Sequence, residues 1–235
     1  PQADDHVGAG TTAFAAGDFD RAEAQFHVAL EYDPEMAEAL NGLGLVAFAR
    51  KNFKLARQRF QEALSKDDDF AEGHANLGAV ELELKHAEIA LPHLRAALDI
   101  DPGFVPARQN LAEALRQVGR VAEAREELMK LSAITADNPH VWAALAHVEL
   151  ALGNRAAAGR ANRSALDLDP EYPLALRVKA SLLRDGGDLL GALAQFEALL
   201  AKAPSDADLL VDRGITLLLL GRKDDAREDV ERATE

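Results

Sequence analysis

Histidine side chains at helical spacing are the residues of this chain best suited to metal or acid–base chemistry. His140 and His147 are seven residues apart. This spacing puts both on one face of a helix but about 10 Å apart along its axis, because each residue adds about 1.5 Å. One metal ion cannot bind both without rearrangement. Glu113, which lies one sequence repeat before His147, could approach that histidine. His86 and His93 have the same spacing. We therefore expect polar surface residues at these positions, and no metal centre or cofactor.

Other catalytic signatures are missing from the sequence. The chain has no cysteine, which excludes a disulfide framework, a thiolate nucleophile and a cysteine metal site. It contains no G-x-S-x-G elbow, no phosphate-binding loop and no Gly-rich dinucleotide fingerprint. The glycine pairs Gly8/Gly10 and Gly42/Gly44 lie within helical patterns, where small residues serve packing. The sequence therefore predicts a protein that is not an enzyme.

The net charge restricts the class of partner. Forty acidic and 26 basic residues give a net charge of −14. Nucleic-acid binding needs an excess of lysine and arginine on the binding face, so we expect no nucleic-acid partner. The longest notable apolar run, residues 215–220, is far too short to span a bilayer, and we expect no membrane insertion. The chain starts at Pro1 without methionine, which suggests an excised piece and leaves its compartment open.

The elements that carry these residues follow a 34-residue period. Repeats begin at residues 3, 37, 71, 105, 139, 173 and 207, and one column of the repeats is alanine throughout: Ala22, Ala56, Ala90, Ala124, Ala158, Ala192 and Ala226. A second column contains only glycine or alanine: Gly10, Gly44, Gly78, Ala112, Ala146, Ala180 and Gly214. Near the end of most repeats stands a proline, as at Pro34, Pro102, Pro170 and Pro204.

Each repeat contains two helical patterns of about a dozen residues. We expect the turn between them at Gly17, Lys51, Lys85, Gly119, Gly153, Gly187 and Gly221. The small columns let two antiparallel helices approach closely, and larger residues fill the space around that contact: Phe26, Phe60, Leu94, Leu128 and Phe196. The fifth repeat has Asn162 in this large apolar column, so we predict looser packing there.

This pattern resembles the tetratricopeptide repeat, whose period, helix-turn-helix unit and small-small-aromatic-small-Pro order are all present. The resemblance covers residues 3–235. It implies an all-α, right-handed superhelical solenoid of seven helix-turn-helix units, forming a single domain over residues 1–235, with repeats at 3–36, 37–70, 71–104, 105–138, 139–172, 173–206 and 207–235. In this family the first helices line a concave groove, which implies a protein or peptide ligand.

Mapping the groove positions of this family onto the chain gives the candidate binding residues. The apolar candidates are Phe14, Leu45, Phe48 and Leu82, and the polar candidates are Asn76, Asn110, Arg116, His147, Arg177 and Arg184. Exposed apolar patches usually mark a partner site, and two arginines suit an acidic group of the ligand. Asn76 and Asn110 resemble the asparagine ladder by which some family members hold a peptide backbone. Alternatively, the phenylalanines and Leu82 pack against adjacent helices, and the arginines pair with Asp185 or another acid of the repeats.

Three functions remain open at this point. The first is a scaffold or adaptor that binds a peptide or protein segment in its concave groove. The second is a structural protein that self-assembles through its first and last helices, so that a homo-oligomer is expected. The third is the docking arm of a larger enzyme or of a secretion or export complex. The two-carboxylate clamp of the family needs lysine and asparagine where this chain has Val7 and Thr11, so chaperone-tail binding is disfavoured.

Overall fold

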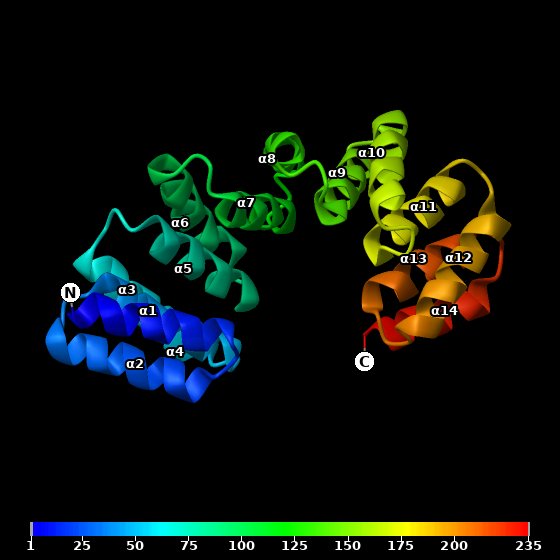
Figure 1. Cartoon of the computed structure of the whole chain (residues 1–235). Coiled ribbons are helices and arrows are strands. Elements are labelled where there is room, and N and C mark those ends of the chain that lie inside the picture. The colour runs from blue at the N-terminus through cyan, green and yellow to red at the C-terminus, as the bar shows by residue number, and fades with distance from the viewer. Residues whose placement is uncertain (1, 235) are drawn as a thin grey trace. The chain divides into compact units, whose positions relative to one another are not determined.

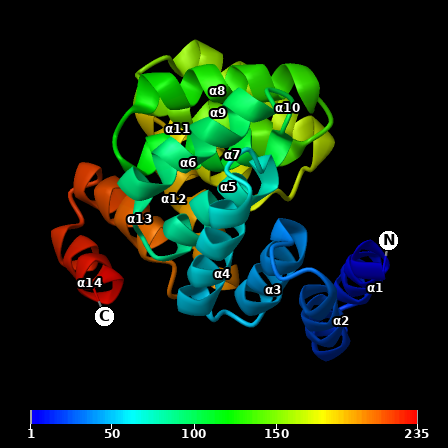
Figure 2. The ribbon, with the colours of Figure 1, turned by 90° about the vertical axis from the view of Figure 1, so that its left-hand side faces the viewer.

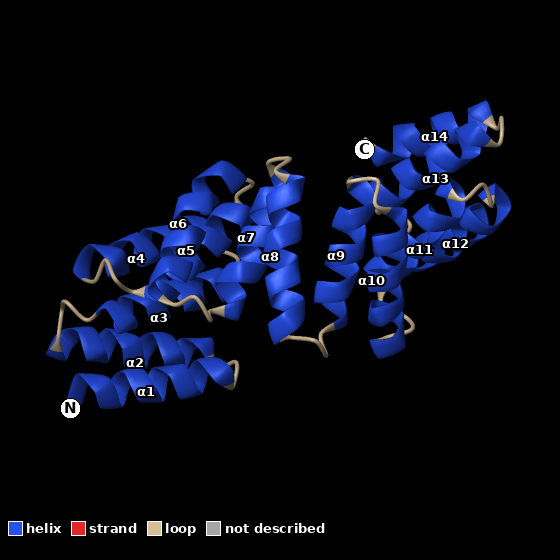
Figure 3. Ribbon diagram, turned by 90° about the horizontal axis from the view of Figure 1, so that it is seen from above, coloured by secondary structure: helices blue, strands red, loops and turns tan. Residues whose placement is uncertain are grey.

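The computed structural model describes residues 2–234, which form fourteen α-helices and no strand (Figures 1 and 3). The predicted all-α repeat fold is thereby confirmed. None of the described helices has the length and apolar character needed to cross a membrane. The helices are α1 (Gln2–Ala15), α2 (Phe19–Tyr32), α3 (Ala37–Ala49), α4 (Phe53–Lys66), α5 (Ala71–Glu83), α6 (Ala87–Ile100), α7 (Val105–Gln117), α8 (Val121–Ile134), α9 (Pro139–Ala151), α10 (Arg155–Leu168), α11 (Pro173–Asp185), α12 (Leu189–Lys202), α13 (Ala207–Leu219) and α14 (Lys223–Ala233).

The odd-numbered helices are the first helices of the repeats, and the even-numbered ones are the second helices. From α3 to α13, each first helix begins at the residue where the 34-residue period starts a repeat. Asp18 and Asn52 show how second helices start: each side chain accepts a hydrogen bond from a backbone N–H three residues later. Such caps satisfy amide groups that have no partner inside the helix. The local sequence signals and the helix boundaries therefore agree.

The turn between the two helices of each repeat requires a left-handed backbone residue. All seven residues that we expected there have positive φ, from 60° at Lys51 to 92° at Gly187. Glycine adopts this conformation without the clash that a Cβ atom causes, which explains why five of the seven residues are glycine. Lys51 and Lys85 adopt it despite their side chains. The predicted turn positions are confirmed.

The core lies between the helices of each pair and at the junctions between successive repeats. Every member of the alanine column is buried. Phe60 is fully buried against Gly44, where a Cβ atom would lie only 2.4 Å from its Cε1. Phe26 occupies the corresponding place against Gly10 and also reaches Gly42 of the next first helix. The glycine column is therefore the notch that receives the large side chain of the second helix, as we expected.

The fifth repeat departs from this packing at Asn162. The side chain takes the place of the phenylalanine or leucine of other repeats and is 4% exposed. Its Oδ1 has no hydrogen-bond partner among residues 2–234. A buried carbonyl oxygen without a partner costs free energy that an apolar side chain would not. We regard this residue as a weak point of the fifth repeat.

The helices group into two compact units, residues 1–120 and 121–235, each of which is described by itself. In the first unit, α1 pairs with α2, α3 with α4 and α5 with α6, and each pair packs on the next first helix up to α7. In the second unit, α9 pairs with α10, α11 with α12 and α13 with α14, while α8 packs on α9. The boundary falls between α7 and α8, the two helices of the fourth repeat. The single domain over residues 1–235 stays a prediction.

Candidate functional site

The first helices of the first unit lie side by side, because α3 contacts both α1 and α5, and α5 contacts α7. Their apolar candidates are Phe14, Leu45 and Phe48, which are all half-buried. The Phe48 ring meets the Phe53 ring edge to face, with 5.4 Å between centroids. The ring of Phe14 is 5.5 Å from that of Phe19. Each candidate phenylalanine therefore rests on the second helix of its own repeat and keeps part of its surface exposed.

Leu82 differs from the expectation of an exposed anchor. Its side chain lies in the last turn of α5 and is only 8% exposed. A leucine that is already removed from water gains little from contact with a ligand. Leu82 thus follows the alternative interpretation, in which the side chain packs against neighbouring helices. We therefore assign Leu82 to the core.

The two candidate asparagines of the first unit have different surroundings. Asn76 is half-buried, and its Nδ2 donates a hydrogen bond to Oδ1 of Asn41 at 2.9 Å, which joins α3 to α5. Asn110 is also half-buried and makes no hydrogen bond with any residue that the structure describes. The Asn76 side chain is thus fixed by the fold, whereas the Asn110 amide keeps its donors and acceptor available.

Arg116 is an exposed residue of α7 whose charge is balanced locally. Its guanidinium donates two hydrogen bonds to the Glu113 carboxylate, at 2.8 and 2.7 Å. Gln117 donates to the same carboxylate at 2.7 Å. Paired arginines of this kind attract an anionic ligand less than a free arginine does, since the carboxylate already offsets the charge.

In the second unit, Arg177 and Arg184 of α11 both contact Asp212 of α13. Nε of Arg177 donates to Oδ2 at 2.6 Å, and Nη1 of Arg184 donates to Oδ1 at 3.1 Å. Arg177 also donates to Asp208 at 3.0 Å. Burial works to lower the pKa of Arg177, but the hydrogen bonds and charges of Asp212 and Asp208 together outweigh it and raise this pKa. These contacts match the alternative in which acids of the repeats pair with both arginines.

The two histidines of α9 do not converge on a common ligand position. His147 is half-buried and has interaction partners of its own within the described chain. Nδ1 of His140 lies 2.8 Å from the Tyr172 hydroxyl. Within residues 2–234, no group of three histidine, aspartate or glutamate side chains could hold a metal ion.

Sequence reasoning missed Asn41 and Asp212 as partners of the candidate residues. In both pairs, Asn41 with Asn76 and Arg177 with Asp212, the partners are 35 residues apart. This distance is one repeat plus one residue, so each pair connects a position on one first helix with the position next to its equivalent on the following first helix. A search for polar residues at that spacing would have found both pairs.

The helix pairs, the left-handed turns and the periodic core together define a helical repeat protein. One model of the tetratricopeptide repeat matches residues 7–73, 47–103 and 177–235, and a second model of the same repeat matches residues 81–148. The chain belongs to the tetratricopeptide repeat family. Members of this family generally act as non-catalytic scaffolds for protein–protein interaction and bind protein or peptide partners. No curated protein sequence matches the chain.

Three solved structures illustrate the proteins that share this fold. PilF from Pseudomonas aeruginosa is 22% identical, with a TM-score of 0.76 over 88% of this chain and 95% of that one. PilW, described as a type IV pilus biogenesis factor, is 20% identical, with a TM-score of 0.73 over 88% and 96%. YrrB, described as a repeat protein with an unusual peptide-binding site, is 24% identical, with a TM-score of 0.64 over 74% and 90%. These identities establish a shared fold alone.

Proposed function

We propose that the chain is an adaptor that binds a peptide or protein segment on the first helices of residues 1–120, with apolar anchors at Phe14, Leu45 and Phe48. The observation that carries this proposal is that three large apolar side chains stay partly exposed on neighbouring first helices. A phenylalanine side chain gains about 1.5–3 kcal/mol when fully buried, so partial exposure leaves part of that gain for a ligand.

The ligand that suits this surface is a short amphipathic or extended segment with apolar side chains at intervals. Asn110 is available to bind a backbone or side-chain group of that segment, since it makes no hydrogen bond within the described chain. The peptide-binding site described for YrrB, a protein of the same fold, is compatible with such a role. In the proposal Arg116 of α7 remains a candidate polar contact, and His147 of α9, which belongs to the second unit, stays a separate candidate.

Arg177 and Arg184 take a smaller part in the proposal than the apolar residues. Both already hold Asp212, and Arg177 also holds Asp208. An acidic ligand group would compete with these carboxylates for the guanidinium donors. We therefore propose that the two arginines chiefly join α11 to α13, and that the apolar anchors of the first unit supply most of the affinity.

The test uses a random peptide library selected on the wild-type chain. Affinities of the enriched peptides are then measured for wild type, for Phe48→Glu and for a control variant, Gln61→Glu. The control adds the same charge at an exposed residue of α4. The expected result is shared apolar side chains in the peptides and binding at least about tenfold weaker for Phe48→Glu only. Equal affinity for Phe48→Glu, with helicity retained, would overturn the proposal.

A further inference from the structure

A cavity of about 330 Å³ lies between α8 and α10 in the second unit. Helix α9, which packs against both, supplies the residues between them (Figure 2 labels all three helices). The lining includes Arg125 and Met129 of α8, Trp142 of α9, and Arg160 and Ala161 of α10. Ligand pockets begin at a volume of about 300 Å³, so this cavity has room for one large side chain or a group of similar size.

The cavity is enlarged because α10 carries alanine where other second helices carry larger side chains. Ala157 stands at the position of Leu55 in α4. Ala161 is the small member of its column, whose other members are Gln25, Arg59, His93, Glu127, Gln195 and Asp229. The corresponding cavity between α2 and α4 is lined by Leu55 and Arg59 and is smaller, at about 240 Å³. The two alanines therefore widen the space beside α9.

The column of Ala161 can contact the first helix of its own repeat. In the first repeat, Nδ1 of His6 lies 2.8 Å from Oε1 of Gln25, which comes 19 residues later. Trp142 and Ala161 occupy the same two positions in the fifth repeat. The methyl group of alanine cannot fill the place of the longer glutamine side chain. Trp142 accordingly keeps part of its surface exposed on the cavity.

The surface that Trp142 contributes is apolar. Its one polar group, the indole N–H, donates a hydrogen bond to the carbonyl oxygen of Ala136 at 2.8 Å. Met129 lines the same cavity and is 47% exposed. Aromatic rings pair favourably with one another and with the sulfur of methionine. The apolar part of the cavity is therefore suited to an aromatic group.

The charged side chains of the lining leave one positive charge without a partner. Nε of Arg125 lies 2.6 Å from Oε1 of the almost fully buried Glu149. The guanidinium of Arg160 has no hydrogen bond or ion pair with any of residues 2–234. Two arginines and one glutamate give the lining a net charge of +1, in a chain whose net charge is −14. A ligand that carries a negative charge beside an aromatic group would complement this lining.

We propose that this cavity binds an aromatic side chain from an acidic peptide segment of a partner protein. The ring lies against Trp142 and Met129, and a carboxylate beside it in the peptide pairs with Arg160. A peptide is favoured over a free small molecule, because members of this family bind protein or peptide partners and the cavity has room for about one side chain. This site belongs to the second unit and uses none of the apolar anchors proposed for residues 1–120.

Trp142 itself supplies the readout for this site, because it is the one tryptophan of the chain and its fluorescence therefore reports on the cavity. The probe is a short blocked peptide in which a phenylalanine is flanked by two glutamates on each side. It would be titrated into the full chain up to millimolar concentration. Two control peptides replace the phenylalanine with alanine or the glutamates with lysine.

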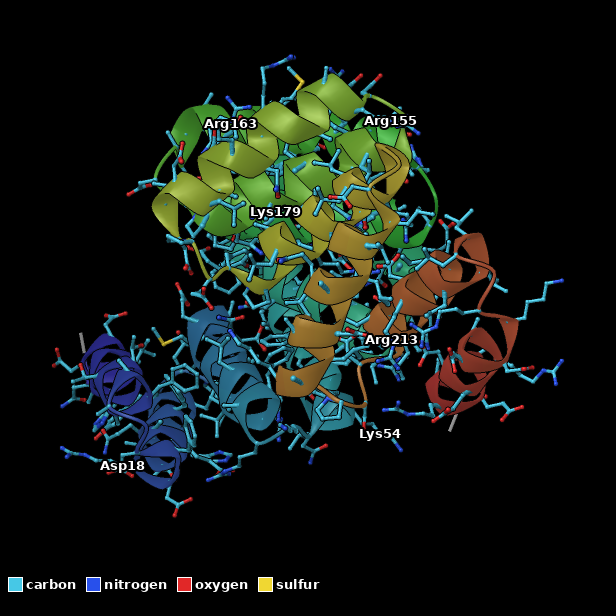
Figure 4. All side chains as sticks on the ribbon, turned by 90° about the vertical axis from the view of Figure 1, so that its right-hand side faces the viewer. Asp18, Lys54, Arg155, Arg163, Lys179 and Arg213 are labelled. Carbon is cyan, nitrogen blue, oxygen red and sulfur yellow. The ribbon has the colours of Figure 1, made fainter. Side chains whose placement is uncertain are left out.

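Three variants of the chain locate the binding. Ala161→Gln fills the cavity with the side chain that the first and sixth repeats carry at this position, and Arg160→Glu reverses the charge without a partner. Arg163→Glu is the matched control, because Arg163 is an exposed residue of the same helix that does not line the cavity (Figure 4). We expect a saturable fluorescence change, with binding about tenfold weaker for Ala161→Gln and Arg160→Glu and unchanged for Arg163→Glu.

The proposal would be overturned by the absence of a saturable change, by equal binding of the lysine peptide, or by full affinity in Arg160→Glu. Circular dichroism shows whether Ala161→Gln keeps its helices, and Arg160→Glu tests the same site at an exposed residue. Phenylacetate that binds as tightly as the peptide would also overturn the proposal, since the ligand would then be a small aromatic carboxylate. Phe48→Glu should bind the probe like wild type, so this test and that of the proposed function can fail separately.

Discussion

Arg125 and Glu149 form an ion pair across the junction of the fourth and fifth repeats, with 2.6 Å between Nε and Oε1. The carboxylate is nearly inaccessible to solvent, and its other oxygen accepts a hydrogen bond from Nδ2 of Asn154 at 2.8 Å. A buried carboxylate is tolerated only when its hydrogen bonds are satisfied. The pair shows how this chain joins neighbouring repeats with a polar contact where another junction has Leu193 and Leu217.

Removing one member of that pair should destabilise the chain. We expect Arg125→Leu to lower the free energy of unfolding by about 2–3 kcal/mol, because the partner carboxylate remains buried without its cation. The double variant Arg125→Leu/Glu149→Leu should recover most of the loss, since Leu193 and Leu217 already show an apolar pair at the equivalent positions. Urea unfolding of both variants measures this. A double variant no more stable than the single one would contradict the argument.

The glycine column offers a matched pair of substitutions. Gly44→Ala should lower the free energy of unfolding by about 1–3 kcal/mol, because the new Cβ would lie 2.4 Å from the Phe60 ring. Gly214→Ala should raise it by about 0.5–1 kcal/mol, since the nearest atoms there are 3.5 and 3.6 Å away and alanine favours the helix. Thermal unfolding followed by circular dichroism compares the two. Equal effects of the two substitutions on stability would show that contact with the large side chain does not require glycine at position 44.

Asn162 is the place where a single substitution should stabilise the chain. We expect Asn162→Leu to raise the free energy of unfolding by about 1–2 kcal/mol, because it removes a buried oxygen that has no partner among residues 2–234 and restores an apolar side chain. The exposed Arg163 provides the control, Arg163→Leu, which should change stability little. A destabilised Asn162→Leu variant would mean that the space cannot accept the larger side chain.

His93 should make stability depend on pH. Burial lowers the pKa of His93, and the neighbouring His74, whose Nδ1 is 3.4 Å from that of His93, lowers it further, while Glu81 acts in the opposite direction. The unfolded chain, with a histidine pKa near 6.5, therefore binds more protons than the folded chain, so stability falls as the pH falls through that region. His93→Gln should lose less stability than wild type between pH 8 and about 5. Parallel pH profiles would contradict this assignment.

The fold could be predicted because the period makes positions comparable within a single sequence. Each alanine or glycine of the small columns has one geometric role in every repeat, and the repeated residue type reveals that role. The left-handed turns at Lys51 and Lys85 could be located in the same way, although lysine is not a typical turn residue. The division of the helices after Arg120 has no counterpart in the period.

The candidate site was harder to predict, because exposure depends on the residue that each side chain meets. Leu82 and Phe48 occupy one column, yet Leu82 is buried and Phe48 keeps an exposed part. Arg177 lies at a groove position of the family, but its charge is balanced by Asp212 of the following repeat. A column assigns a position on a helix, whereas the neighbouring repeat determines whether that position remains available.

Photo-crosslinking from the first helices tests the central claim most directly. A benzophenone amino acid would replace either Leu45 on α3 or Gln61 on α4, and each chain would be irradiated with a selected peptide. We predict a covalent product from position 45 and none from position 61, because the ligand lies against the partly exposed apolar residues of the first helices. A product from position 61 alone would place the ligand on the second helices and contradict the proposed function.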